Sequence, residues 1–369
     1  MKSIKIIASF LFYFSLTISI EAQDKLNIVV EEVSVIQTDE DIFIGDPRHI
    51  IADSLIYVAD HVDLTIKVFN KGGKYISKFG GRGRGPGEML DMSVFWKTKN
   101  HLLVFDNLNA KVIKWTLEGD FLEEIFIKNS ELQWPRAVEN YRETNHLLVY
   151  HLPNPEDESL FHIWDENFDR RVRSFSIISL IEDNMDNSQL EKNLMKFQPG
   201  SIVIDRNGKL YYSPFLYRGI IYEYDLSSAN DWNNVYKGYS VSNDVYDEVR
   251  RKKTGAAKNY DISFSLNGIS YAILLKSISV GMYETKEGYL IHFISFVKNG
   301  RKLWGFEVYD ENRNYLGFKN LVTKEIKGEE STLIRLFTKT IDDENRVFVV
   351  EDKGQGKREI KSYKVHINQ

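Results

Sequence analysis

The pentapeptide Asn-His-Leu-Leu-Val occurs twice without change, at residues 100–104 and again 45 residues later at residues 145–149. An internal repeat of this length is typical of propellers and other repeat arrays, in which each copy is one supersecondary unit. The repeat therefore decides how the rest of the chain is interpreted.

A short apolar run, a polar turn and a second apolar run recur six times along the chain. The paired runs begin at Ser54 and Thr65, His101 and Ala110, His146 and Leu160, Lys209 and Ile220, Tyr289 and Leu303, and Arg346 and Glu359. The short runs are rich in Ile, Val, Tyr and Phe, which indicates β-strands. They are apolar on both faces, so each small sheet must be covered on both sides, as radially stacked blades are. The sequence predicts an all-β fold, a six-bladed β-propeller.

Residues 78–88, KFGGRGRGPGE, hold five glycines and two arginines, a composition that also suits a phosphate-binding loop. Such a loop would lead into a helix, whose first N–H groups hold the anion. Here the chain continues with Ser-Val-Phe-Trp at residues 93–96, which is typical of a strand. We interpret the stretch as the crossing from the rim of blade 1 to the axis of blade 2. Prolines stand just before the first strand of four copies, at Pro47, Pro86, Pro135 and Pro199.

Five short motifs in the first copy resemble the NHL repeat: residues 58–60, 66–69, 73–74, 79–80 and 85–87. The clear match covers roughly residues 45–127, or two copies. The Asn and Arg that the family usually carries between the second and third strands are Asp63 and Thr65 in copy one. Copy two keeps Asn109 but has Lys111. The resemblance implies a six-bladed propeller like those found among exported bacterial proteins.

Three segments lie outside the copies. Residues 179–197 have Leu190, Leu194 and Phe197 at helical spacing, and residues 245–260 are charged and compatible with a helix, so we expect short helical insertions. Residues 26–36 read as a lone strand without a repeat of its own. We expect this N-terminal strand to close the ring beside the C-terminal strands.

The first 22 residues carry Lys2 and Lys5 before an uncharged, mostly apolar run from Ile6 to Ile20, and Ala22 is a plausible last residue before cleavage. This pattern predicts a secretory signal peptide, leaving residues 23–369 as one propeller domain. The rival interpretation, an uncleaved anchor, needs roughly 20 apolar residues and the run is shorter. We expect a periplasmic or secreted monomer without an integral membrane segment after cleavage.

The formal net charge is -5 and the chain has no cysteine. An acidic balance argues against a nucleic-acid partner. Without disulfides, an exported chain needs a core large enough to be stable alone. We expect no cofactor.

In a propeller, the crossings into the first strands and the turns between second and third strands emerge on one face around the central channel. We call it the channel face. The candidate ligand-binding residues there are Arg48, His49, Asp91, Arg136 and Arg335. The candidate metal ligands are His61, Asp63 and His151, because imidazole and carboxylate groups are suitable ligands for zinc or manganese. The alternative is structural: Asp60, Asp63 and Asp106 stand where Asx turns are wanted, and Arg48 and Arg136 can pair with Asp46 or Asp91.

Two functions remain open. We prefer a non-enzymatic exported propeller that binds a protein or a small ligand, anionic if the arginines hold it, on the channel face. The alternative is a metal-dependent lyase or hydrolase with its site in the channel. The chain has no GxSxG elbow, no HExxH helix and no cysteine nucleophile, which removes several enzyme classes.

Overall fold

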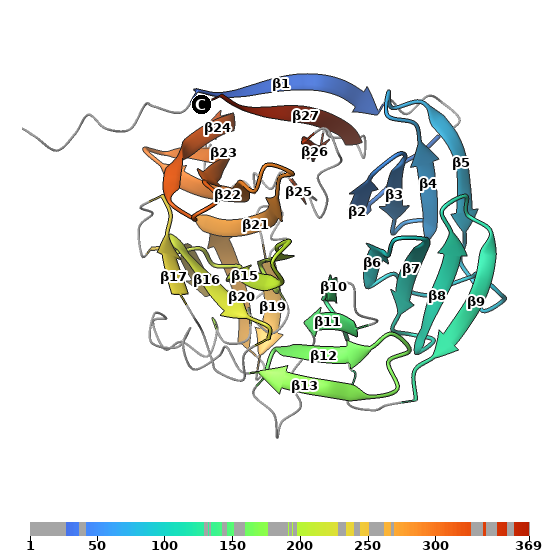
Figure 1. Cartoon of the computed structure of the whole chain (residues 1–369). Coiled ribbons are helices and arrows are strands. Elements are labelled where there is room, and N and C mark those ends of the chain that lie inside the picture. Colours follow the sequence, from blue (N-terminus) through green and yellow to red (C-terminus); the bar gives the residue numbers. More distant parts are fainter. Residues whose placement is uncertain are drawn as a thin grey trace, which may run out of the picture.

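The structure of the protein is a computed structural model. It describes residues 27–36, 42–128, 132, 134–141, 146–150, 159–175, 191, 194, 198–227, 234–239, 244–250, 262–266, 269–325, 335–336, 345–352 and 358–368. The strands form six sheets around one axis, and the chain passes from each sheet to the next around the ring (Figure 1). The predicted six-bladed β-propeller is confirmed.

Each blade is an antiparallel sheet of four strands, ordered from the axis to the rim. Blade 1 has β2 (Pro47–Ala52), β3 (Ile56–Asp60), β4 (Thr65–Phe69) and β5 (Tyr75–Gly80), and blade 2 has β6 (Val94–Lys97), β7 (His101–Asp106), β8 (Lys111–Thr116) and β9 (Phe121–Phe126). Blade 3 has β10 (Ala137–Tyr141), β11 (His146–Tyr150), β12 (Phe161–Asp165) and β13 (Arg171–Phe175), and blade 4 has β14 (Ser201–Ile204), β15 (Lys209–Ser213), β16 (Ile220–Asp225) and β17 (Asn234–Lys237). Blade 5 has β21 (Ser277–Glu284), β22 (Leu290–Lys298), β23 (Arg301–Tyr309) and β24 (Tyr315–Glu325), and blade 6 has β25 (Arg335–Leu336), β26 (Arg346–Asp352), β27 (Arg358–Asn368) and β1 (Asn27–Ile36).

The middle strands of the blades are buried on both faces. Every residue of β3 and β4 is buried, whereas the rim strand β5 alternates between half-buried and exposed side chains. This is the burial that the two-sided apolar runs predict, because each blade is covered by its neighbours and only its rim meets water. The apolar cores accordingly lie between blades. Side chains of β3 and β4 pack with those of β7 and β8, and a separate cluster joins β26 and β27 to blade 1.

The N-terminal strand closes the ring. β1 is the rim strand of blade 6 and pairs antiparallel with β27, from Asn27 opposite Asn368 to Ile36 opposite Ile360. The two strands lie side by side in Figure 1, in blue and dark red. The expectation for residues 26–36 is confirmed.

Residues 78–80 end the rim strand β5, and residues 81–88 lie in the crossing to the inner strand β6, as expected. Gly80 and Gly87 have φ values of 79° and 74°, in the left-handed region that favours glycine. The Glu88 carboxylate folds back and accepts the backbone N–H of Gly85 at 2.8 Å. A carboxylate of the chain itself therefore occupies a donor that a phosphate would use.

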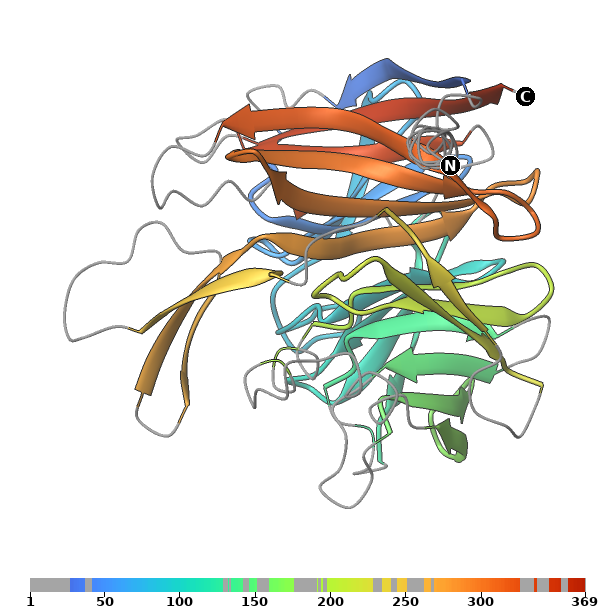
Figure 2. The ribbon, with the colours of Figure 1, turned by 90° about the vertical axis from the view of Figure 1, so that its left-hand side faces the viewer.

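The crossing from blade 4 to blade 5 differs from the prediction for residues 245–260. In place of a helix, it contains a separate sheet of β18 (Tyr246–Arg250), β20 (Ile269–Leu275) and β19 (Ile262–Leu266), which we call the arm. The arm extends away from the ring in Figure 2. For residues 246–250 the helix prediction was wrong, because β18 pairs with β20, from Tyr246 opposite Leu275 to Arg250 opposite Tyr271. Local spacing does not reveal a partner so far along the chain.

Residues 251–260 lie outside the described part of the chain. Of residues 179–197, Glu191 and Leu194 are described; both are helical and buried.

Candidate functional site

Asp60, at the end of β3, joins the crossing into blade 1 to the turn between β3 and β4. Its carboxylate accepts the N–H groups of Gly45 at 2.8 Å, Asp46 at 2.9 Å and Val62 at 3.0 Å. Its charge is balanced by the ammonium of Lys67 at 2.7 Å, and both side chains are buried. Crossing and turn therefore meet on the channel face, held there by one side chain.

Asp106 repeats this arrangement at the end of β7. It accepts the N–H groups of Leu90 at 2.9 Å and Asp91 at 3.2 Å from the crossing, and those of Leu108 and Asn109 at 3.1 Å from the turn. Both aspartates thus serve the structural role that Asx geometry suggests.

The two candidate arginines occupy equivalent positions in blades 1 and 3. Arg48 precedes His49, which pairs with Ala59 near the end of β3, and Arg136 precedes Ala137, which pairs with Tyr150 at the end of β11. Arg48 is exposed and its Nε donates to Asp46 at 2.8 Å. Arg136 is half-buried.

The charges of this group act on one another. Burial lowers the pKa of the Arg136 guanidinium, the carboxylate of Asp91 opposes that effect, and the positive charge of Arg48 adds to it. The structure thus brings Arg48, Asp91 and Arg136 into one electrostatic group. Asp91 also accepts the side-chain amide of Asn107 at 3.3 Å. The backbone of Arg335 lies on β25, the inner strand of blade 6, and its side chain is outside the described part.

The candidate metal ligands are only partly described. The rings of His49 and His61 lie with their centroids 5.8 Å apart. Asp63 accepts the Thr65 hydroxyl at 2.7 Å and pairs with Lys67 at 2.9 Å. His151 lies outside the described residues. Within the described part of the chain, no three His, Asp or Glu side chains gather in a way that could hold a metal ion.

Blade 5 contains a buried polar chain that sequence reasoning missed. The hydroxyl of Ser279 on β21 is 2.8 Å from Nε2 of His292 on β22, and Nδ1 of His292 is 3.0 Å from a carboxylate oxygen of Glu307 on β23. Glu307 also accepts the hydroxyls of Tyr217 at 2.6 Å and Tyr309 at 2.9 Å.

The order serine, imidazole, carboxylate is that of a hydrolytic triad, but its environment is not. His292 and Glu307 are fully buried, and the Ser279 hydroxyl is hydrogen-bonded at 2.6 Å to Ser201 of blade 4. A nucleophile must be reachable by its substrate, and this buried serine is not. The hydrogen bonds therefore have a structural role: they join blade 4 to blade 5. The sequence signal for it is a titratable residue flanked by apolar ones in each of two strands, His292 in LIHFISFVK and Glu307 in RKLWGFEVY.

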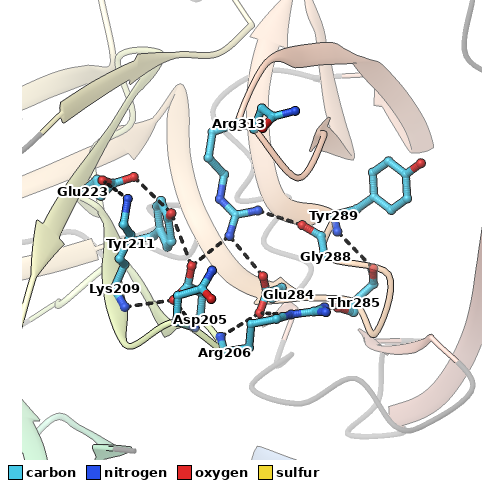
Figure 3. Close-up of polar contacts among 12 residues, drawn as sticks. Asp205, Arg206, Lys209, Tyr211, Glu223, Glu284, Thr285, Gly288, Tyr289 and Arg313 are labelled. Atoms are coloured by element: carbon cyan, nitrogen blue, oxygen red, sulfur yellow. Dashed lines mark hydrogen bonds and ion pairs between the residues drawn. The ribbon is translucent and has the colours of Figure 1, made fainter.

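A second polar cluster joins blades 4 and 5 on the face of the ring opposite the channel face. It lies in the turns after β14, β21 and β23 (Figure 3). The guanidinium of Arg313 bridges Asp205 and Glu284 at 3.1 Å each and donates to the Gly288 carbonyl at 2.7 Å. It also lies 4.6 Å from the centre of the Tyr211 ring. Arg206 pairs with Glu284 and Lys209 with Glu223, so three cations balance three carboxylates. The cluster has the character of a clamp between blades.

The comparisons with known proteins fit this architecture. The model of a family described as a domain of unknown function, DUF4934, matches residues 14–350. The chain belongs to the DUF4934 family. No curated protein matches this DUF4934 chain.

Two solved structures resemble the DUF4934 chain along nearly its whole length. A member of the DUF4221 family from Bacteroides vulgatus aligns with a TM-score of 0.59 at 9% identity, covering 94% of this chain and 99% of that one. A Bacteroides fragilis protein named "Putative exported protein" aligns with a TM-score of 0.53 at 14% identity, covering 95% and 98%. At these identities the likeness shows the fold alone. Among the described residues, no helix is long and apolar enough to cross a membrane.

Proposed function

We propose that the protein is an exported, non-enzymatic β-propeller that binds a ligand with carboxylate or phosphate groups on its channel face. The observation that carries this proposal is the strand register that places Arg48 and Arg136 at equivalent positions of blades 1 and 3, just before the residues that pair with Ala59 and Tyr150. An anion bound between two guanidiniums relieves their repulsion, and each guanidinium offers paired donors that match a carboxylate or a phosphate. We include His49, Asp91 and Arg335 as proposed neighbours of the ligand.

Export is part of the proposal. It is supported by the cationic, apolar start of the chain and by the name of the similar Bacteroides fragilis protein. We expect native protein to begin close to Gln23. N-terminal sequencing of protein from its own cells tests this, and a native N-terminus at Met1 would contradict it. Kinship with NHL-repeat proteins, based on residues 45–127, is likewise a proposal.

The binding proposal is tested with citrate and inorganic phosphate as probes in isothermal titration calorimetry. The double variant Arg48→Ala with Arg136→Ala should lose about 1.5 to 3 kcal/mol of binding free energy per charged hydrogen bond removed. Its free energy of unfolding should barely change, because Arg48 is exposed and an ion pair with a solvent-exposed partner, such as Arg48 with Asp46, contributes little.

The matched control is Arg170→Ala, an exposed arginine in the turn between β12 and β13, on the opposite face. Binding should survive that change. If wild type binds neither probe, the proposal is wrong. If the double variant unfolds more easily while affinity is intact, the two arginines are structural clamps and the proposal is equally wrong.

A further inference from the structure

We infer that the ligand of the channel face is a polypeptide segment that combines carboxylates with apolar side chains. The inference rests on the proposed function and names the class of its ligand. It comes from four exposed apolar residues in blades 1 to 3, which we call the apolar arc: Phe43, Val62, Leu108 and Trp134. Their exposed fractions are 62%, 51%, 62% and 43%, so all four present most or much of their apolar surface to solvent.

Val62 and Leu108 are presented by the same device in consecutive blades. Each lies two residues after the aspartate that ends the second strand, and its N–H donates to that carboxylate, Val62 to Asp60 and Leu108 to Asp106. The Asx geometry fixes the backbone, so both side chains emerge on the channel face. The same device therefore presents an exposed apolar side chain at the same position of two consecutive blades.

Phe43 extends the arc from the crossing into blade 1. A Cβ built on Gly45 would lie 2.5 Å from Val62 Cγ2 and 2.7 Å from Phe43 Cε1, so the two apolar side chains close over this glycine. The Arg82 guanidinium, from the glycine-rich crossing into blade 2, donates to the Val62 carbonyl at 3.3 Å and is exposed. An apolar surface and a guanidinium are therefore adjacent.

Trp134 ends the arc in the crossing into blade 3. Its φ is 48°, in the left-handed region that bulky side chains seldom adopt, and Pro135 and Arg136 follow it. Backbone held in such a region concentrates at binding sites. The crossing begins beside the turn that carries Leu108, because Ile127 donates to the Ala110 carbonyl at 2.8 Å.

The charged residues around the apolar arc indicate which class of ligand it binds. The chain as a whole is acidic, with a net charge of -5, yet the arc is bordered by Arg48, Arg82 and Arg136. Tryptophan and arginine are the residues that most often carry binding energy at protein interfaces. A bilayer with anionic head groups fits less well, because Asp46, which pairs with Arg48, and Asp91, whose charge acts on Arg136, would meet the same lipid phosphates. A segment with single carboxylates can instead place each one opposite an arginine.

Selection from a library of short random peptides displayed on phage tests the inference. Wild-type protein should enrich peptides in which Asp or Glu stands next to Leu, Phe, Trp or Val. The enriched peptides are then synthesised, and their dissociation constants are measured by fluorescence anisotropy.

Two matched variants locate the contact. In the arc variant, Phe43→Ser, Val62→Ser and Leu108→Ser are combined. In the rim variant, Ile76→Ser, Val172→Ser and Val235→Ser remove equally exposed apolar residues of the rim strands β5, β13 and β17. The arc variant should weaken peptide binding at least about tenfold and the rim variant less than about twofold. Arg82→Glu should reduce affinity for acidic peptides and leave affinity for their Asn and Gln analogues unchanged.

Four results would overturn the inference: no enrichment above bare matrix, equal losses in both variants, co-sedimentation with phosphatidylglycerol vesicles that the arc variant abolishes, or self-association that it abolishes. The vesicle result would assign the arc to a membrane and the last result to a second copy of the chain. If no peptide binds while citrate or phosphate still binds through Arg48 and Arg136, only this inference is wrong and the proposed function stands. If those anions fail as well, the proposed function falls with it.

Discussion

Single aspartates decide the geometry of the channel face. Asp60 and Asp106 accept the same backbone donors in neighbouring blades, but their surroundings balance the charge differently. Asp60 is opposite the buried ammonium of Lys67, whereas Asp106 accepts the side-chain amide of Asn109 at 2.7 Å. One site holds a buried ion pair and the other holds a carboxylate among neutral donors.

This difference predicts unequal costs for the same substitution. Asp60→Asn leaves the Lys67 ammonium buried with Asp63 as its remaining partner and should lower the free energy of unfolding by about 3 to 5 kcal/mol. Asp106→Asn leaves no buried cation behind and should cost about 1 to 3 kcal/mol. Urea denaturation at pH 7 measures both. Equal losses would show that the ion pair adds nothing to the backbone hydrogen bonds.

The stability of wild type and that of Asp60→Asn should respond differently to acid. Burial alone raises the pKa of the Asp60 carboxyl, but the hydrogen bonds from Lys67 and from the N–H groups of Asp46, Gly45 and Val62 outweigh it, so the folded-state pKa lies below the usual value. Stability from such a group is fully present above the unfolded pKa of about 3.9 and is lost as pH falls through the folded pKa. Unfolding free energies measured from about pH 5 to pH 2 should therefore fall more steeply for wild type than for Asp60→Asn. Parallel curves would contradict this.

Residues near one another in sequence were the ones that sequence reasoning placed well. The Asx role of Asp60 and Asp106 involves donors two or three residues away, and the equivalence of Arg48 and Arg136 follows from the repeat. Glu307 was missed because Tyr217, which donates to it, is 90 residues away in the chain. Its surroundings exist only after blades 4 and 5 meet.

At the scale of elements, the join between blades 4 and 5 depends on Glu307. Glu307→Gln presents an amide NH2 to a site built of hydroxyl, imidazole and backbone donors, so at least one buried donor loses its acceptor. We expect a loss of about 2 to 4 kcal/mol in unfolding free energy. Ser279→Ala, which removes only the end of the same chain of hydrogen bonds, should cost about 1 kcal/mol. Chemical denaturation ranks the two, and the reverse order would contradict the assignment.

Ring closure gives the second prediction at this scale. Deleting residues 24–36 removes β1, exposes the edge of β27 and uncovers Ile360, which packs beside Ile36. The loss should reach several kcal/mol, a large part of the roughly 5 to 15 kcal/mol that a domain has in total. Differential scanning calorimetry should show a lower melting temperature, and a synthetic peptide of residues 24–36 should restore it. An unchanged melting temperature would contradict closure by this strand.

Elements that repeat were predictable, and the insertion was not. Six copies of one pattern fix strand type and order, because each copy repeats the same burial on both faces. Residues 246–250 carry Asp, Glu and Arg between single apolar residues, and only their pairing with β20 makes them a strand.

On the scale of the whole molecule, the arm is an addition to a complete ring. The arm starts and ends at one point, since the Val245 carbonyl accepts the N–H groups of Lys276 at 2.8 Å and Ser277 at 3.0 Å. Replacing residues 249–272 by Asn-Gly joins Glu248 to its ladder partner Ile273 and keeps the buried Ile273 and Leu275.

This shortened protein should keep the β-sheet circular dichroism of wild type and lose only a few degrees in melting temperature. Collapse of the spectrum would show that the arm is required for the ring to form.

The pairing of β1 with β27 also determines when the ring can close during synthesis. Asn27 and Asn368 are neighbours in the ring but lie at opposite ends of synthesis. At about 5 to 20 residues per second, a ribosome needs roughly 20 to 70 seconds between the two strands. During that interval the ring is open, so the first blade and the latest completed blade each have a neighbour on one side only, and the edge of β1 is open to pairing with other chains. The topology therefore leaves the chain most exposed to pairing with other chains before β27 is made.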